Sequence, residues 1–114
     1  MILNTGNMFV LDTHCDTPSQ ILRLRDLSKD NDYAHVDYPK LKRGGVDGVF
    51  FALYIPAALD SDPDKAFEYA GRLLKGVEDS VRDRNDVAFA RNAEEAYANK
   101  DESKLSVFLG LENG

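Results

Sequence analysis

Two side chains that can bind a metal ion stand two positions apart near the start of the chain. His14 and Asp16 follow the short apolar run of residues 8–11. If that run is a strand, side chains at positions i and i+2 point to the same face, roughly 6–7 Å apart along the strand. An imidazole nitrogen and a carboxylate oxygen at this spacing can converge on one ion, with bonds of about 2.0–2.2 Å. An exposed polar turn after a strand fits the same residues, so the spacing alone leaves both interpretations open.

The neighbours of this pair have different expected places. Cys15 lies between His14 and Asp16, so it points to the opposite face and is predicted to pack rather than to take part in chemistry. It is the only cysteine of the chain, which excludes a disulfide framework and an all-cysteine zinc site. Asp12 is predicted to share the face of His14, one step deeper, as a supporting group.

Two further candidate residues end other apolar runs. Glu112 directly follows residues 105–111, at the C-terminal end of a predicted buried strand, where α/β folds place their ligand sites. A simply solvated carboxylate also fits that position. Tyr54 ends the run of residues 46–55 and is predicted to line a substrate pocket at the same end of the sheet. An aromatic side chain that only fills the space between packed layers fits Tyr54 equally well.

Strands and helices alternate along the chain. Proline in the first turn and polar capping residues predict helices that begin at Thr17, Asp62 and Asn92, the first of them running through Leu24. Apolar runs without helical periodicity predict the strands, at residues 8–11, 46–55 and 105–111, with a brief extended stretch at 87–90. This alternation predicts crossover units and a parallel sheet.

Composition limits the classes of protein. The chain has 114 residues, 43% hydrophobic and 30% charged, which is typical of globular domains. Fourteen Lys and Arg against twenty Asp and Glu give a net charge of −6, which argues against nucleic acid as a partner. No apolar run approaches the roughly 18–20 residues of a membrane-spanning helix. Residues 1–7 carry neither the basic nor the apolar part of a signal peptide, so a cytoplasmic location is expected.

Three segments together resemble the N-terminal part of the membrane dipeptidase (renal dipeptidase) family of the amidohydrolase superfamily. They are LDTHCDTPSQIL near the start, HVDYPKLKRGGVDGVFFALYIP in the middle and LSVFLGLENG at the end. The resemblance covers nearly the whole chain, in the right order. It implies an α/β fold, the N-terminal part of a (β/α)8 TIM barrel, with residues 1–114 as a segment of one hydrolase domain. Such a barrel needs about 250 residues, so this chain is expected to supply about three of its eight strands.

The resemblance also assigns roles to the candidate residues. It implies that His14 and Asp16 bind one zinc ion and that Glu112 bridges this ion to a second one. The second ion takes two histidines from later strands, and proton transfer belongs to a later aspartate. The only other histidine here is His35, which is predicted to be a loop residue. The family usually continues its glutamate with Gly-Gly-His, whereas residues 113–114 are Asn-Gly.

The complete protein is therefore expected to hydrolyse dipeptides with two zinc ions and a metal-activated water, while this chain alone is expected to be inactive. One alternative is another amidohydrolase-type hydrolase, although those relatives typically have His-x-His where this chain has His14 and Asp16. Another is a non-catalytic α/β module that keeps the motif. A dipeptide substrate is the expected partner, and a homodimer stays open.

Overall fold

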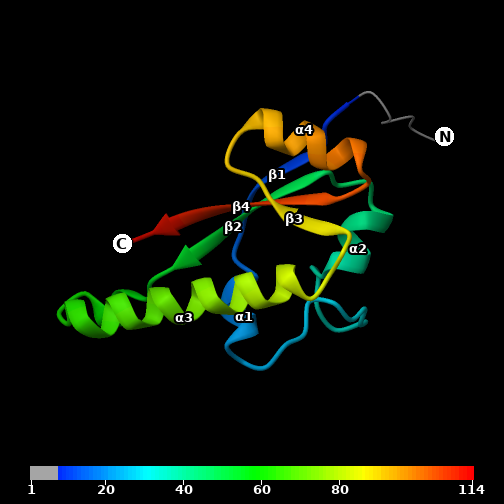
Figure 1. Cartoon of the computed structure of the whole chain (residues 1–114). Helices are drawn as coiled ribbons and strands as arrows, with labels where there is room; N and C mark the ends of the chain where they lie inside the picture. Colours follow the sequence, from blue (N-terminus) through cyan, green and yellow to red (C-terminus); the bar gives the residue numbers. More distant parts are fainter. Residues whose placement is uncertain (1–7) are drawn as a thin grey trace.

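Four parallel strands form the only sheet of the part of the chain described by the computed structural model, residues 8–114. The expectation about a signal peptide falls on residues 1–7, outside the described residues. The spatial order of the strands is β1-β2-β4-β3, so the long strands β2 and β4 are central and β3 lies at one edge (Figure 1). The strand bounds are Leu11–Cys15 for β1, Gly48–Tyr54 for β2, Val87–Phe89 for β3 and Leu105–Glu112 for β4.

The helices begin where the sequence supplies a cap. The side chains of Asp37, Asp62 and Asn92 accept hydrogen bonds from the backbone N–H three residues further on, as N-cap residues do. The side chain of Thr17, where a helix start is also predicted, forms no such hydrogen bond. The first helix ends at Ile21, before the predicted end at Leu24. The helix bounds are Pro18–Ile21 for α1, Tyr38–Arg43 for α2, Pro63–Arg82 for α3 and Ala93–Asp101 for α4, with a 3₁₀ turn, η1, at Ala57–Leu59.

The core lies between one face of the sheet and the helices α1, α2 and α3 (Figure 1). Its side chains come from alternate positions of β2 and β4, because successive side chains of a strand point to opposite faces. Helix α3 meets them with a buried stripe that recurs at helical spacing. The most completely buried members are Val49, Phe51, Leu105 and Val107 of the sheet and Leu73 and Val77 of α3.

Helix α4 lies across the other face of the sheet (Figure 1). The Nδ2 of Asn99 donates to the Oγ of Ser106 at 3.0 Å and to the carbonyl of Phe89 at 3.2 Å. Ser106 alternates with the buried Val107, so this contact reaches the face that the core does not use. None of the described helices is long and apolar enough to cross a membrane.

The short strand β3 precedes β4 in the sequence but lies beyond β4 at the edge of the sheet. It pairs with the outer edge of β4 only from Leu105 to Val107, so the expected extended stretch is a true strand of the sheet. Among the described residues, the outer edge of β4 has no strand partner beyond Val107. The C-terminal half of β4, which carries Glu112, is therefore held on one side only, by β2.

A buried tyrosine gives the fold a pH-dependent stability. Tyr38 is fully buried and its hydroxyl lies 2.7 Å from the Oγ of Ser80, which itself donates to the carbonyl of Val77. The Tyr38 hydroxyl is thus the donor, and burial raises its pKa from 10.0 to about 12. The folded state favours the neutral phenol, so this contribution to stability is intact below pH 10 and lost between about pH 10 and pH 12.

We expect the free energy of unfolding, measured in urea, to fall by up to about 1.4 kcal/mol per pH unit in that window because of Tyr38. Tyr38→Phe removes the titrating group. It serves as the comparison because the lysines, the arginines and the other tyrosines are the same in both chains. The variant should lose less stability above pH 10 than the wild type. Parallel losses in both chains would contradict the assignment.

Candidate metal centre

A bulge in β1 sets the directions of the side chains near His14. Asp12 pairs with Val49 and Cys15 pairs with Phe51, so three steps along β1 match two steps along β2. The extra residue interrupts the pattern in which successive side chains of a strand point to opposite faces of the sheet. Cys15 therefore returns to the buried face, whereas His14 stays exposed.

The same bulge corrects the expectation for Asp12. This residue lies opposite the buried Val49 in the register and does not share the face of His14. Its Oδ1 accepts a hydrogen bond from the backbone N–H of His14 at 3.0 Å. Asp12 thus fixes the backbone at the bulge and is a supporting group through this hydrogen bond.

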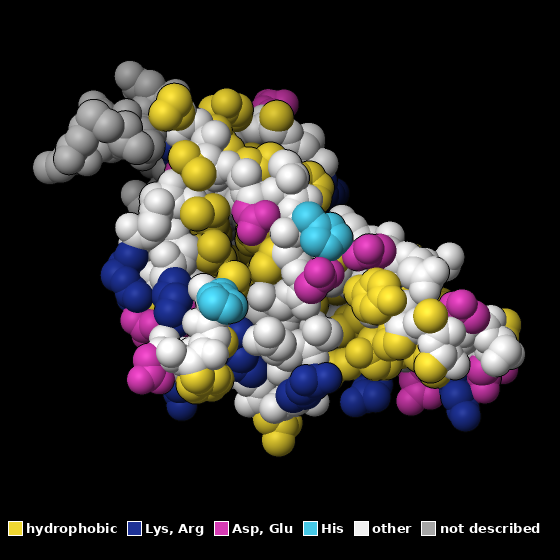
Figure 2. All heavy atoms as spheres, turned by 180° about the vertical axis from the view of Figure 1, so that it is seen from behind, with side chains coloured by type: hydrophobic (Ala, Val, Ile, Leu, Met, Phe, Trp, Pro, Cys, Tyr) yellow, Lys and Arg dark blue, Asp and Glu magenta, His cyan; other side chains and the backbone are white. Residues whose placement is uncertain are grey.

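Three side chains converge at the C-terminal ends of β1 and β4. The Nε2 of His14 lies 3.1 Å from the Oδ1 of Asp16 and 3.5 Å from the Oε2 of Glu112. One ligand atom from each residue lies within 4.8 Å of the other two. All three side chains are about half exposed. Figure 2 shows histidine and acidic side chains together on this side of the molecule.

The sequence predicts that His14, Asp16 and Glu112 lie at the ends of neighbouring parallel strands. This prediction is wrong, because the strands that carry them are not neighbours. Strand β2 lies between β1 and β4, so His14 and Glu112 meet across it. Below them is a hollow of about 480 Å³ whose floor includes the small residues Ala52 and Gly110. Small residues at these positions leave room for the longer side chains to reach across β2. Asn113 lines the same hollow.

Tyr54 occupies the last register position of β2, opposite Glu112, and 40% of its surface is exposed. Residues paired across a parallel ladder point to the same face, so Tyr54 lies on the face that carries Glu112. It does not line the hollow beneath the three ligand atoms. A role in substrate binding stays a prediction.

The loop between α1 and α2 forms a second hollow, of about 740 Å³, beside the same residues. His14 and Asp16 line one end of it, and His35 lies in its lining together with Arg23 and Tyr33. His35 is an exposed loop residue, as predicted. That Arg23 and Tyr33 lie near the candidate ligands could not be predicted, because no periodic sequence pattern covers this loop.

Arg25 and Asp37 hold this loop in place. The guanidinium of Arg25 donates to the side chain of Gln20 and to the carbonyl of Val36. It also forms an ion pair with the fully buried carboxylate of Asp37, at 3.8 Å. The side chain of Lys40 completes the neutralisation of Asp37. A buried charge persists only where it is paired in this way.

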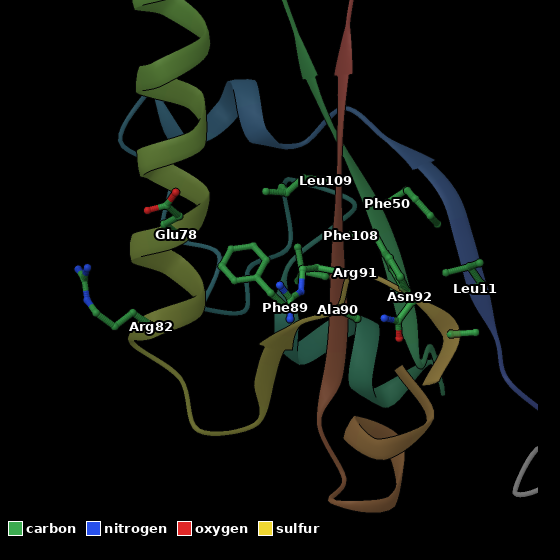
Figure 3. Close-up of a pocket in the computed structure, with 12 residues that line it drawn as sticks. Leu11, Phe50, Glu78, Arg82, Phe89, Ala90, Arg91, Asn92, Phe108 and Leu109 are labelled. Atoms are coloured by element: carbon green, nitrogen blue, oxygen red, sulfur yellow. The ribbon is translucent and has the colours of Figure 1, made fainter. Parts of the chain in front are cut away.

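A hollow larger than the two above lies elsewhere, along the open edge of β4 (Figure 3). It has a volume of about 980 Å³ and a mainly apolar lining that includes Phe50, Phe89, Phe108 and Leu109. The rings of Phe50 and Phe108 stack at 4.6 Å between their centroids. Its charged members are Glu78, Arg82 and Arg91, and no group of three potential metal ligands lies there.

Comparisons with known proteins relate the chain to metallopeptidases. The family model of membrane dipeptidases, peptidase family M19, matches residues 5–114. No curated protein matches the chain. Among solved structures, the chain is similar to dipeptidase AC, a metallopeptidase of family M19, with 24% identity and a TM-score of 0.77. It is also similar to a metallopeptidase from Rhodobacter sphaeroides, bound to a phosphinate mimic of the dipeptide L-Ala-D-Ala, with 22% identity and a TM-score of 0.78.

These two matches cover 91% of this chain but only 36% and 38% of the chains it resembles. The chain thus spans little more than a third of their length. The predicted fold class is confirmed, because the parallel sheet and its helices correspond to part of a TIM-barrel metallopeptidase.

The buried thiol of Cys15 allows a test of whether this residue packs in the core or faces the candidate ligands. Cys15 is 7% exposed and its Sγ donates to the Oγ1 of Thr17 at 3.2 Å. We expect Cys15→Ala to lower the free energy of unfolding by about 1 kcal/mol, on the scale of a small core truncation. Zinc affinity, measured by calorimetric titration, should be unchanged. A loss of zinc binding in this variant would mean that the thiol faces the ligands after all.

Proposed function

The chain belongs to the membrane dipeptidase family, peptidase family M19, and from this premise we propose that it carries one half of the metal centre of a zinc dipeptidase. His14 and Asp16 hold one zinc ion, and Glu112 bridges it to a second ion. The observation that carries this proposal is the convergence of the three ligand atoms within 4.8 Å of one another.

The spacing of the donor atoms suits zinc. Ligands at about 2.1 Å from a tetrahedral zinc ion lie about 3.4 Å from one another. The separations of 3.1 and 3.5 Å around the Nε2 of His14 are close to this value. Imidazole nitrogen and carboxylate oxygen are also both donors that zinc accepts. The carboxylate oxygens of Asp16 and Glu112 lie within 4.8 Å of each other, close enough for one ion to join both.

Each residue contributes differently to the reaction. A bound zinc pair makes water a nucleophile near neutral pH and polarises a carbonyl oxygen. His14 and Asp16 fix the position of the first ion from the end of β1, whose bulge is braced by Asp12. Glu112 has two carboxylate oxygens, so one can face His14 while the other serves the second ion. Tyr54, opposite Glu112, contributes to binding of a dipeptide at the open end of the sheet.

The rest of the active site comes from a longer barrel in this proposal. Residues 1–114 form the N-terminal segment of a single barrel domain, and later strands supply the two histidines of the second ion and the group that moves protons. Two features support this arrangement. The C-terminal half of β4 has an open edge, and an apolar hollow of about 980 Å³ lies along it. The related structures are also about two and a half times as long as this chain.

Zinc titration of the metal-free chain tests the ligand set. We expect one ion per chain, and His14→Ala, Asp16→Asn and Glu112→Gln should each weaken its binding at least about tenfold, because each removes one donor. His35→Ala and Glu68→Gln are matched controls with the same residue types at exposed positions outside the group. Their affinity should equal that of the wild type. Equal zinc affinity in His14→Ala would contradict the proposed site.

A hydrolysis assay tests the division of the active site. The chain supplies three donors for one ion and a single donor for the second, so we expect no detectable release of D-alanine from L-Ala-D-Ala with added zinc. A full-length member of the family, assayed beside it, should be active. Turnover by the chain within about tenfold of the full-length enzyme would contradict the proposal that two metal ions, completed by later strands, are needed.

A further inference from the structure

The residue after Glu112 has an unusual backbone conformation. Asn113 has a φ of 59°, in the left-handed region that non-glycine residues seldom adopt. Asparagine tolerates this region better than most residues. The turn at Asn113 ends β4 directly behind Glu112.

The side chain of Asn113 makes a hydrogen bond that glycine could not make. Its Nδ2 donates to the carbonyl oxygen of Ile55 at 2.9 Å. The backbone N–H of Ile55 in turn donates to the carbonyl oxygen of Glu112 at 3.1 Å. Ile55 is 3% exposed, so its backbone is anchored by a core side chain at the end of β2. Together these two bonds form a clamp between the ends of β2 and β4.

The position of Glu112 depends strongly on this clamp. Beyond Val107, β4 is paired only with β2 among the described residues. The last side chains of β4 are themselves poorly packed, since Leu111 is 62% exposed. Apart from the ladder with β2, few contacts among the described residues therefore limit the movement of the strand end that carries the carboxylate.

We propose that Asn113 is a positioning residue that holds the Glu112 carboxylate beside His14 and so preorganises the metal centre. This inference rests on the proposed function of the three ligands. Asn113 acts in two ways, by adopting the left-handed turn and by tying β4 to the carbonyl of Ile55. It contributes no donor to the metal and lines the hollow below the ligand atoms.

Three substitutions separate the two contributions. Asn113→Gly keeps the left-handed turn at no steric cost but removes the hydrogen bond. Asn113→Ala removes the bond and strains the turn. Asn113→Asp keeps a residue that tolerates the turn, but its ionised side chain cannot donate to the carbonyl of Ile55. Asn85→Gly is the matched control, since Asn85 is exposed and lies outside the candidate metal centre.

Cobalt(II) titration, followed by the visible absorption of the bound ion, measures both affinity and ligand geometry. We expect Asn113→Gly and Asn113→Ala to bind cobalt about tenfold more weakly than the wild type, with altered absorption bands, as for other groups that orient metal ligands. Asn85→Gly should match the wild type. If Asn113→Gly kept wild-type affinity and bands, the clamp would play no part and the inference would be overturned.

Hydrogen exchange of the Ile55 amide tests the clamp without any metal. This amide donates to Glu112, so it should exchange faster in Asn113→Gly while amides of the buried centre of β2 stay unchanged. Unchanged exchange at Ile55 would overturn the inference by itself. If the wild-type chain bound no cobalt, or His14→Ala bound it equally well, the proposed function would fail, and the exchange measurement would still decide whether the clamp holds Glu112.

Discussion

The parallel pairing of β2 with β4 is the interaction on which the rest of the structure depends. It runs in register from Gly48 opposite Ser106 to Tyr54 opposite Glu112. On one face it presents the apolar side chains that α3 covers. At its C-terminal end it carries Glu112 to the level of His14. The same ladder therefore builds the core and sets the place of the carboxylate, so a shift in its register would disturb both.

The bulge of β1 is the second constraint. One extra residue lets Cys15 face the core while His14 and Asp16 stay at the open end of the sheet. Bulges commonly re-aim a side chain near functional sites at the cost of a ladder hydrogen bond. Here the carboxylate of Asp12 accepts the backbone N–H of His14 and so compensates part of that cost. The arrangement of the ligands is thus built into the backbone of two strands and does not depend on a mobile loop.

Much of this could be predicted from the sequence, because the signals were local. The uninterrupted apolar runs predicted β2 and β4, and the capping residues predicted for α3 and α4 lie where the chain turns into helix. The grouping of His14, Asp16 and Glu112 followed from their places at strand ends. These features depend on neighbouring residues or on the general rule that parallel strands end at one edge of the sheet.

The details that could not be predicted depend on contacts between distant segments. Nothing near Asp12 signals a bulge, which arises from the fit of β1 to β2. The position of β3 beyond β4 likewise follows from pairing and not from sequence order. Thr17 has the composition of a helix cap, but its hydroxyl accepts the thiol of Cys15 instead. Asn113 looked like a minor departure from the family pattern, and only its φ and its bond to Ile55 reveal a role.

The most direct test of the account is a crystal structure of the chain with zinc, using anomalous scattering at the zinc edge to locate the ion. We expect one zinc site at about 2.0–2.2 Å from the Nε2 of His14 and from one carboxylate oxygen each of Asp16 and Glu112. The backbone of β1 and β4 should be unchanged, since the ligand atoms already lie within 4.8 Å of one another. Zinc bound elsewhere, with no anomalous signal between these three side chains, would contradict it.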